Sequence, residues 1–420
     1  MDQGNTAFML ISAALVLLMT PGLAFFYGGL VKAKSVISMM MLSFGALGLI
    51  GVLWVLYGYA IAFPSAEGLS APWSIDWSAI GLTSLLEVPE GAAYPPLAFV
   101  AFQATFAILT VALVSGAIAD RAKFGAWMIF AALWATIVYF PVASWVFNFG
   151  LAEDGSFAYG GWITYGMQEW FGVGAIDFAG GTAVHINAGA AALALALVLG
   201  KRVGFSKGLH VPHNPPFVLL GAGLLWFGWF GFNAGSELAA DGTAALAFVN
   251  TIAAPAAALL AWLVVEKIRD GKPTSVGAAS GAVAGLVAIT PACASLTPIW
   301  AIVLGIIAGA VCALAVDLKF KWGFDDSLDV VGIHLVGGLI GTLYLGFFAN
   351  GTGLFYSGDL TQLMVQAIAA AAVLAYSFEL TFAIGTIIQK TMGFRVKNED
   401  EIAGIDTVVH GEEGYKLETV

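Results

Sequence analysis

The chain has 420 residues, of which 60% are hydrophobic and only 10% are charged, and its mean hydropathy is +0.90. An ordinary soluble domain is about 25% charged, so this composition excludes a soluble globular protein and indicates a polytopic membrane protein. The net charge of −11 also argues against binding to nucleic acid.

Apolar runs of about 20 residues, long enough to cross the hydrocarbon layer as helices, recur along the chain. Strands of a membrane β-barrel alternate in polarity over about 10 residues. These runs do not alternate, so the fold class is an all-α polytopic membrane protein. We expect eleven transmembrane helices, at residues 6–31, 36–63, 96–119, 124–149, 177–200, 215–234, 242–265, 275–295, 298–316, 330–349 and 360–389.

The basic residues orient these spans. All 16 Lys and Arg residues fall in alternate gaps between the spans or in the segment after the last one. By the positive-inside rule, the N-terminus is expected outside and the C-terminus in the cytoplasm. We therefore expect a membrane domain over residues 1–390 and a cytoplasmic tail over residues 391–420.

The fifth and tenth spans share a pattern. Asp177 precedes His185 by eight residues, Asp326 precedes His334 by eight, and small residues follow both histidines. Because these two spans run in opposite directions, the match indicates two inverted five-helix repeats with one added helix. Inverted repeats are typical of transporters and place the functional site near the midplane where the halves meet.

His185 and His334 are the only histidines within the expected spans, and His210, His213 and His410 lie outside them. An ionisable residue at membrane depth is costly and by default marks a conduction pathway or a relay. Desolvation disfavours imidazolium, so we expect neutral rings, each with one donor and one acceptor nitrogen. Two facing rings that share a hydrogen bond would fix each other's tautomers. The alternative is a histidine that only bonds a neighbouring helix.

Aromatic residues are frequent in FQATF (102–106), PVASWVFNFG (141–150) and WFGWFGFNAGS (226–236). Aromatic faces attract cations, and Ser236 can accept a hydrogen bond from one. Because aromatics make up 13% of the chain, most of them are expected to face lipid or to form interfacial belts. The pattern alone therefore assigns none of them to a site.

Five stretches together resemble the ammonium transporter family (Amt, Mep and Rh proteins), in its bacterial Amt branch. They are TPGLAFFYGGLV, DFAGGTAVHINAG, GWFGFNAGS, DDSLDVVGIHLVGGLIGT and, in the tail, GIDTVVHGEEGY. The resemblance covers nearly the whole chain. It implies a multi-pass protein of the bacterial plasma (inner) membrane, a homotrimer in membrane lipid, with one ammonium pore in each subunit and no cofactor or metal.

The resemblance also implies site roles. His185 and His334 match the paired pore histidines, and Phe106 with Phe232 matches a stacked phenyl gate. Phe102 and Ser236 match residues that form the family's outer cation-recruitment site. The complete implied set of substrate-binding or supporting residues is Phe102, Phe106, Phe147, Asp177, His185, Trp229, Phe232, Ser236 and His334. Within it, Asp177 is expected to cap backbone amides rather than to touch substrate.

One departure concerns the outer site. The family's usual motif there resembles AHWVWG, whereas this chain has Ala143-Ser144-Trp145-Val146-Phe147-Asn148. Phe147 stands where a recruitment tryptophan is expected, and Ser144 replaces a histidine. Since Trp is the best cation–π partner, Phe147 is expected to weaken cation recruitment. Whether Trp145 takes its place stays open at this point.

The expected mechanism is recruitment of NH4+, deprotonation near the phenyl gate and passage of NH3 past the histidines, with the proton returning or crossing separately. A bare ion would lose hydration worth tens of kcal/mol in a low-dielectric pore. Residues 391–420 carry seven acids and three bases. By resemblance, this tail is expected to pack on the inner face and to help dock a PII-type regulatory protein.

Three other functions compete with transport. A membrane haem protein would use His185 and His334 as axial ligands and would be coloured. A metal-dependent hydrolase would need a third ligand and an activated water, and the sequence has no HExxH motif. An ammonium sensor with little transport is the remaining alternative, although sensors usually carry an added signalling domain. We expect a transporter or channel and not an enzyme.

Overall fold

The computed structural model describes residues 1–65, 67–151, 157–207 and 211–415. His210 and the last five residues of the expected tail lie outside these ranges. Within them the regular secondary structure is helical apart from one short antiparallel hairpin and two isolated β-bridges, and loops join the helices. The fold is thus an all-α membrane protein, as the hydropathy predicted.

In the first half, the elements are α1 (Gln3–Leu30), η1 (Ala33–Ser35), α2 (Val36–Leu53), η2 (Trp54–Gly58), α3 (Tyr59–Ala62), η3 (Trp77–Leu85), α4 (Pro96–Val114), η4 (Ser115–Ile118), α5 (Phe124–Trp134), η5 (Ala135–Tyr139), α6 (Phe140–Phe147), β1 (Phe149–Leu151), β2 (Phe157–Gly160), η6 (Trp162–Gly166), α7 (Met167–Phe171), η7 (Gly181–Ile186) and α8 (Asn187–Leu199). In the second half, they are η8 (Phe205–Lys207), α9 (Pro215–Ala234), η9 (Gly235–Glu237), α10 (Gly242–Arg269), α11 (Ser275–Ile289), α12 (Pro298–Ala315), α13 (Leu318–Trp322), η10 (Val331–Leu335), α14 (Val336–Phe348), α15 (Leu354–Ser357), α16 (Thr361–Thr391), α17 (Asn398–Ala403) and η11 (Asp406–His410). The η segments are short 3-10 or π-helical turns, many of which continue a longer helix.

Each expected span falls on an apolar helical stretch. Among the described residues, ten of these stretches are long and apolar enough to cross a membrane. The exception is the span expected at 275–295, where α11 has only 15 residues. It ends ahead of Pro291, and turns follow it. The count of eleven transmembrane helices therefore stays a prediction.

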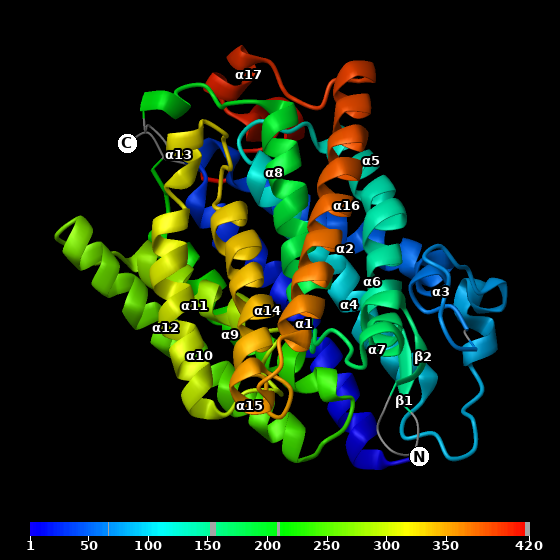
Figure 1. Ribbon diagram of the computed structural model, residues 1–420. Coiled ribbons are helices and arrows are strands. Elements are labelled where there is room, and N and C mark those ends of the chain that lie inside the picture. The colour runs from blue at the N-terminus through cyan, green and yellow to red at the C-terminus, as the bar shows by residue number, and fades with distance from the viewer. Residues whose placement is uncertain (66, 152–156, 208–210, 416–420) are drawn as a thin grey trace.

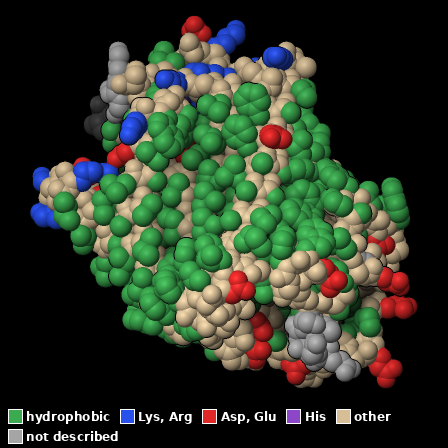
Figure 2. Space-filling model, in the orientation of Figure 1, with side chains coloured by type: hydrophobic (Ala, Val, Ile, Leu, Met, Phe, Trp, Pro, Cys, Tyr) green, Lys and Arg blue, Asp and Glu red, His purple; other side chains and the backbone are tan. Residues whose placement is uncertain are grey.

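The helices form one bundle, with α17 and the N-terminal residue at opposite ends (Figure 1). Figure 2 shows a broad hydrophobic band on the viewed face, with Lys and Arg gathered toward one end and most of the visible Asp and Glu toward the other. Such a band is what lipid contact requires. Which end faces the cytoplasm rests on the positive-inside rule and stays a prediction.

The two helices that carry the histidines pack closely because small residues lie between them. A Cβ atom added to Gly189 of α8 would lie 2.5 Å from the backbone nitrogen of Leu335 in η10. One added to Gly338 of α14 would lie 3.1 Å from the carbonyl oxygen of Gly181 in η7. Glycine at these two positions therefore lets the fifth and tenth spans approach each other.

Candidate functional site

Two phenyl rings stack in the interior of the bundle. Phe106 on α4 and Phe232 on α9 have ring centroids 4.1 Å apart and an interplanar angle of 15°. Both side chains are buried. Nothing as large as a hydrated ion fits between rings at this separation, so the pair is closed in this conformation.

Two further predicted aromatics, Phe102 and Phe147, adjoin Phe106. The Phe102 ring lies 4.9 Å from that of Phe106, one helical turn away on α4. The Phe147 ring, at the end of α6, meets Phe106 edge-on at 6.1 Å. Ser236 on η9 lies one turn beyond Phe232 and donates its hydroxyl to the Phe232 carbonyl at 2.8 Å. The structure therefore brings together the residues expected at the outer site and the gate.

Trp145 lies elsewhere. Its indole N–H donates to the carbonyl of Pro72 at 2.8 Å, and its ring packs against Trp162 and Tyr376 at centroid distances of 5.6 and 4.6 Å. None of these partners belongs to the expected site. Phe147, not Trp145, is therefore the α6 aromatic in contact with Phe106.

The two histidines face each other on π-helical turns. His185 lies on η7 and His334 on η10, and their Nδ1 atoms are 3.2 Å apart. One Nδ1–H donates to the other Nδ1, so the two rings hold different tautomers. Both rings are buried, and Nε2 of His185 has no hydrogen-bond partner among the described residues. π-helical turns within longer helices are frequent at functional sites.

The histidine pair lies beside the phenyl pair. The His185 ring is 6.2 Å from Phe232 and stacks on Trp229 at 5.5 Å. Trp229 is held by a 2.8 Å hydrogen bond from its indole N–H to Oγ1 of Thr290. Thr290 could not be singled out from the sequence, because its neighbours are apolar and it belongs to no motif.

Aspartates hold the starts of both π-helical turns. Asp177 accepts hydrogen bonds from the backbone N–H groups of Gly180, Thr182 and Ala183 at 2.9, 2.9 and 3.1 Å. The amide of Gly181 and the hydroxyl of Thr182 also donate to it. Asp326 accepts from the next turn in the same way, through Val330 N–H at 3.1 Å and Val331 N–H at 2.7 Å. Both acids therefore fix the turns that carry the histidines.

A buried ion network, which the sequence did not reveal, joins three of these helices at one end. Arg202, just after α8, binds Asp325 at 2.9 Å and Asp120 at 3.2 Å. Burial alone would raise the pKa of Asp325, but the hydrogen bonds and charge of Arg202 outweigh it and hold the pKa below its ordinary value. Asp120 ends the stretch that carries Phe106, and Asp325 precedes the turn that carries His334, so Arg202 ties together the ends of three site helices.

The site offers no evident place for a metal. Among the described residues, no three His, Cys, Asp or Glu side chains are grouped to hold a metal ion. The two histidines bond each other through the nitrogens that face, which does not suit ligands on opposite sides of one iron.

The chain is similar in sequence and in structure to known proteins. A sequence model of the Ammonium Transporter Family matches residues 7–415. An ammonium transporter of Mycobacterium tuberculosis is 55% identical, over 99% of this chain and 90% of its own. Among solved structures, a sensor Amt protein superposes with a TM-score of 0.86 at 28% identity, covering 97% of this chain and 98% of its own. Candida albicans Mep2 superposes with a TM-score of 0.83 at 31% identity, covering 95% and 88%.

Proposed function

We propose how this chain, which belongs to the ammonium transporter family and transports ammonium across a membrane, carries out that transport. It recruits NH4+, removes the proton near the phenyl pair and passes NH3 along the histidine pair. The observation that carries this proposal is the continuity of the site. Phe106 stacks on Phe232, Phe232 adjoins His185, and His185 bonds His334. These contacts support a single path through the protein interior.

Energetics favour deprotonation before passage. Moving an ammonium ion into an apolar interior costs on the order of tens of kcal/mol in the Born limit, which two phenyl faces worth about 0.5–2 kcal/mol each do not offset. Neutral NH3 avoids this cost. It is both a donor and an acceptor, so it can pass neutral imidazoles that offer one donor and one acceptor nitrogen each. The proton returns outside or crosses separately along the histidines.

Recruitment is assigned to Phe102, Phe106, Phe147 and Ser236. Three aromatic rings gather there, and one hydroxyl lies a turn beyond Phe232; aromatic rings and hydroxyl oxygens are groups that attract a small cation. Phe147 provides a weaker face than the tryptophan expected from the family motif, and Trp145 is engaged with Pro72. A sensor that binds ammonium without conducting it is not favoured, since the more similar relatives are described as transporters.

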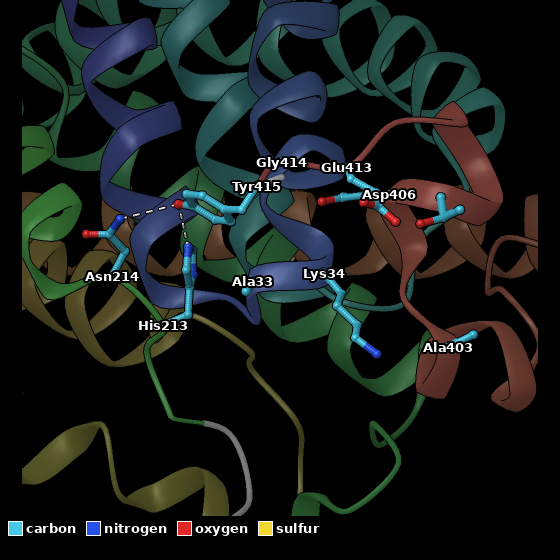
Figure 3. Close-up of a pocket in the computed structure, with 10 residues that line it drawn as sticks. Ala33, Lys34, His213, Asn214, Ala403, Asp406, Glu413, Gly414 and Tyr415 are labelled. Atoms are coloured by element: carbon cyan, nitrogen blue, oxygen red, sulfur yellow. Dashed lines mark hydrogen bonds between the residues drawn. The ribbon is translucent and has the colours of Figure 1, made fainter. Parts of the chain in front are cut away.

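Residues 391–415 support an assignment as a regulatory tail. Asp406 accepts from the N–H groups of Ile37 and Ser38 at 3.0 and 2.7 Å, at the start of α2. The hydroxyl of Tyr415 bonds Nε2 of His213 at 2.9 Å, beside a cavity of about 630 Å³ between the tail and the membrane domain (Figure 3). We assign this face to a cytoplasmic PII-type regulatory protein, and the functional unit to a homotrimer in a bacterial plasma membrane.

Proteoliposomes test the proposed function. With a pH dye inside, an inward ammonium gradient should change the internal pH faster with the protein present than in empty vesicles, because NH3 binds a proton on arrival. Equal rates together with no ammonium-dependent current would overturn the proposal, because a proton that crosses with NH3 cancels the internal pH change. A steady current in the same vesicles would show that the proton also crosses, and its absence would show net NH3 transport.

A further inference from the structure

A small cavity of about 170 Å³ opens at the end of the bundle where the basic residues gather. It lies where the ends of α1, α8, α9, α11 and the turn before η10 converge. Helix α9 carries Phe232, and the helical stretches that include α8 and η10 carry the two histidines, so this cavity lies at the ends of helices that carry the site. Its lining residues are Leu30, Arg202, Phe205, Pro212, Val276, Lys319, Phe320, Ser327, Leu328 and Asp329.

The ammonium group of Lys319 is held in the wall of this cavity. Its Nζ lies 2.6 Å from Oδ1 of Asp329 and donates to the carbonyl oxygen of Asp326 at 3.1 Å. The ring of Phe320 lies 5.4 Å from the same nitrogen. A carboxylate, a carbonyl and an aromatic face are also the partners that a free ammonium ion would take. Lys319 is only 9% exposed, so it is not a solvated surface lysine.

The backbone keeps the acid in this position. Asp329 has a φ of 64°, in the left-handed region that residues with a Cβ atom rarely adopt. Its carbonyl accepts from the N–H of Ile333 at 2.9 Å, within the turn that carries His334. The Asp329 backbone is therefore joined to the turn that carries His334, and Asp329 also lines the cavity.

We propose that this cavity is the exit of the path and that Lys319 is a specificity-determining residue there: its tethered ammonium group occupies a cation site made by Asp329, the Asp326 carbonyl and Phe320, and so prevents departing ammonium from being retained. The identity of the competing ion rests on the proposed function. NH3 that reaches the cavity takes up a proton and becomes a cation beside an acid. With Lys319 in place the acid is already neutralised, and the ion leaves.

Removal of the lysine side chain should create an ammonium site. Lys319→Ala keeps Asp329, whereas Lys319→Ala with Asp329→Asn removes both charges. The matched control is Lys321→Ala, because Lys321 lies on the same short helix but is exposed and does not line the cavity. Lys319→Arg retains a cation and should behave like the native chain.

The test compares thermal unfolding of the purified proteins in ammonium chloride and in choline chloride at equal concentration. A ligand that binds only the folded state raises the unfolding temperature. We expect ammonium to raise the unfolding temperature of Lys319→Ala by more than it raises that of the native chain. In the double variant and in Lys321→Ala, the rise should be no larger than in the native chain. An equal shift in Lys319→Ala and the native chain, or an added shift that survives in the double variant, would overturn the proposal.

Transport gives a second readout. In proteoliposomes, internal ammonium should half-inhibit uptake by Lys319→Ala at about tenfold lower concentration than for the native chain, which corresponds to about 1.4 kcal/mol. Lys319→Gln provides the same test if the alanine variant does not fold. Unchanged inhibition would count against the proposal. Failure of the proposed function is distinguishable, because it would appear as absent uptake by the native protein and would leave the thermal comparison intact.

Discussion

His185 and His334 meet through Nδ1 atoms 3.2 Å apart, and each lies eight residues after an aspartate that caps its π-helical turn. The two halves of the pair are built alike, since Asp177 accepts hydrogen bonds from the backbone of one turn and Asp326 accepts them from the other. Two turns of matching construction therefore place one imidazole each at a shared point, which is the geometry that the predicted inverted repeat requires.

The outer aromatic site should respond to Phe147→Trp. Because the indole face attracts a cation more strongly than a phenyl face, by about 0.5–1 kcal/mol, KM for methylammonium should fall about two- to fivefold with little change in maximal rate. Uptake of labelled methylammonium measures both. Trp145→Phe is the matched control and should leave KM unchanged, since Trp145 contacts Pro72 and not Phe106. An unchanged KM in Phe147→Trp would remove Phe147 from the recruitment site.

The two capping aspartates should differ in importance. In the native chain, Asp177 accepts hydrogen bonds from five donors, whereas Asp326 accepts from two amides. Asp177→Asn would leave only one acceptor oxygen for those five donors. Loss of buried hydrogen bonds costs about 1–3 kcal/mol. We expect Asp177→Asn to lower both the unfolding temperature and the rate of uptake more than Asp326→Asn does. The reverse order, measured on purified and reconstituted protein, would be inconsistent with the capping role.

Acid should weaken the Asp325–Arg202 pair. The pKa of Asp325 is lower in the folded chain than its unfolded value of about 3.9. Its stabilising contribution is therefore complete above about pH 4 and is lost as the pH falls through the lowered folded pKa. Thermal unfolding in detergent from pH 7 to pH 3 should show a flatter acid limb for Asp325→Asn than for the native chain, and parallel acid limbs would refute this.

Asp406 should control how firmly the tail is held. Asp406→Asn weakens two charge-assisted hydrogen bonds at the start of α2, worth about 1–2 kcal/mol together. The fraction of molecules with an undocked tail should rise about 5- to 30-fold, and the rate of tryptic cleavage in the tail should rise with it. Glu412→Gln, an exposed acid four residues before Lys416, is the control. Equal cleavage of the two variants would show that Asp406 does not hold the tail.

Much of the fold follows from the sequence because lipid imposes simple rules. Apolar length located the spans, and the matched spacing of Asp177 and Asp326 from the histidines predicted the facing pair. The contact between Phe147 and Phe106 was harder to predict. The π-helical turn η5 precedes α6 and shifts the helical phase, so counting residues along the helix did not decide between Phe147 and Trp145.

The charges at the exit were not predictable from one sequence. Arg202 and Lys319 contributed only to the positive-inside count, because their partners Asp325 and Asp329 lie in the turn before the tenth span. That these ends converge on one cavity is a property of the packed bundle. Arg202 and Asp325 are far apart in the sequence, so their positions do not indicate that the two residues meet.

The most direct test of the transport mechanism compares the native protein with His185→Ala in proteoliposomes, by ammonium uptake with and without excess K+. We expect the native protein to take up ammonium and to exclude K+, because a dehydrated ion cannot cross the apolar path. The variant should transport ammonium more slowly or admit K+. Native rate and native K+ exclusion in His185→Ala would contradict passage of NH3 along the histidine pair.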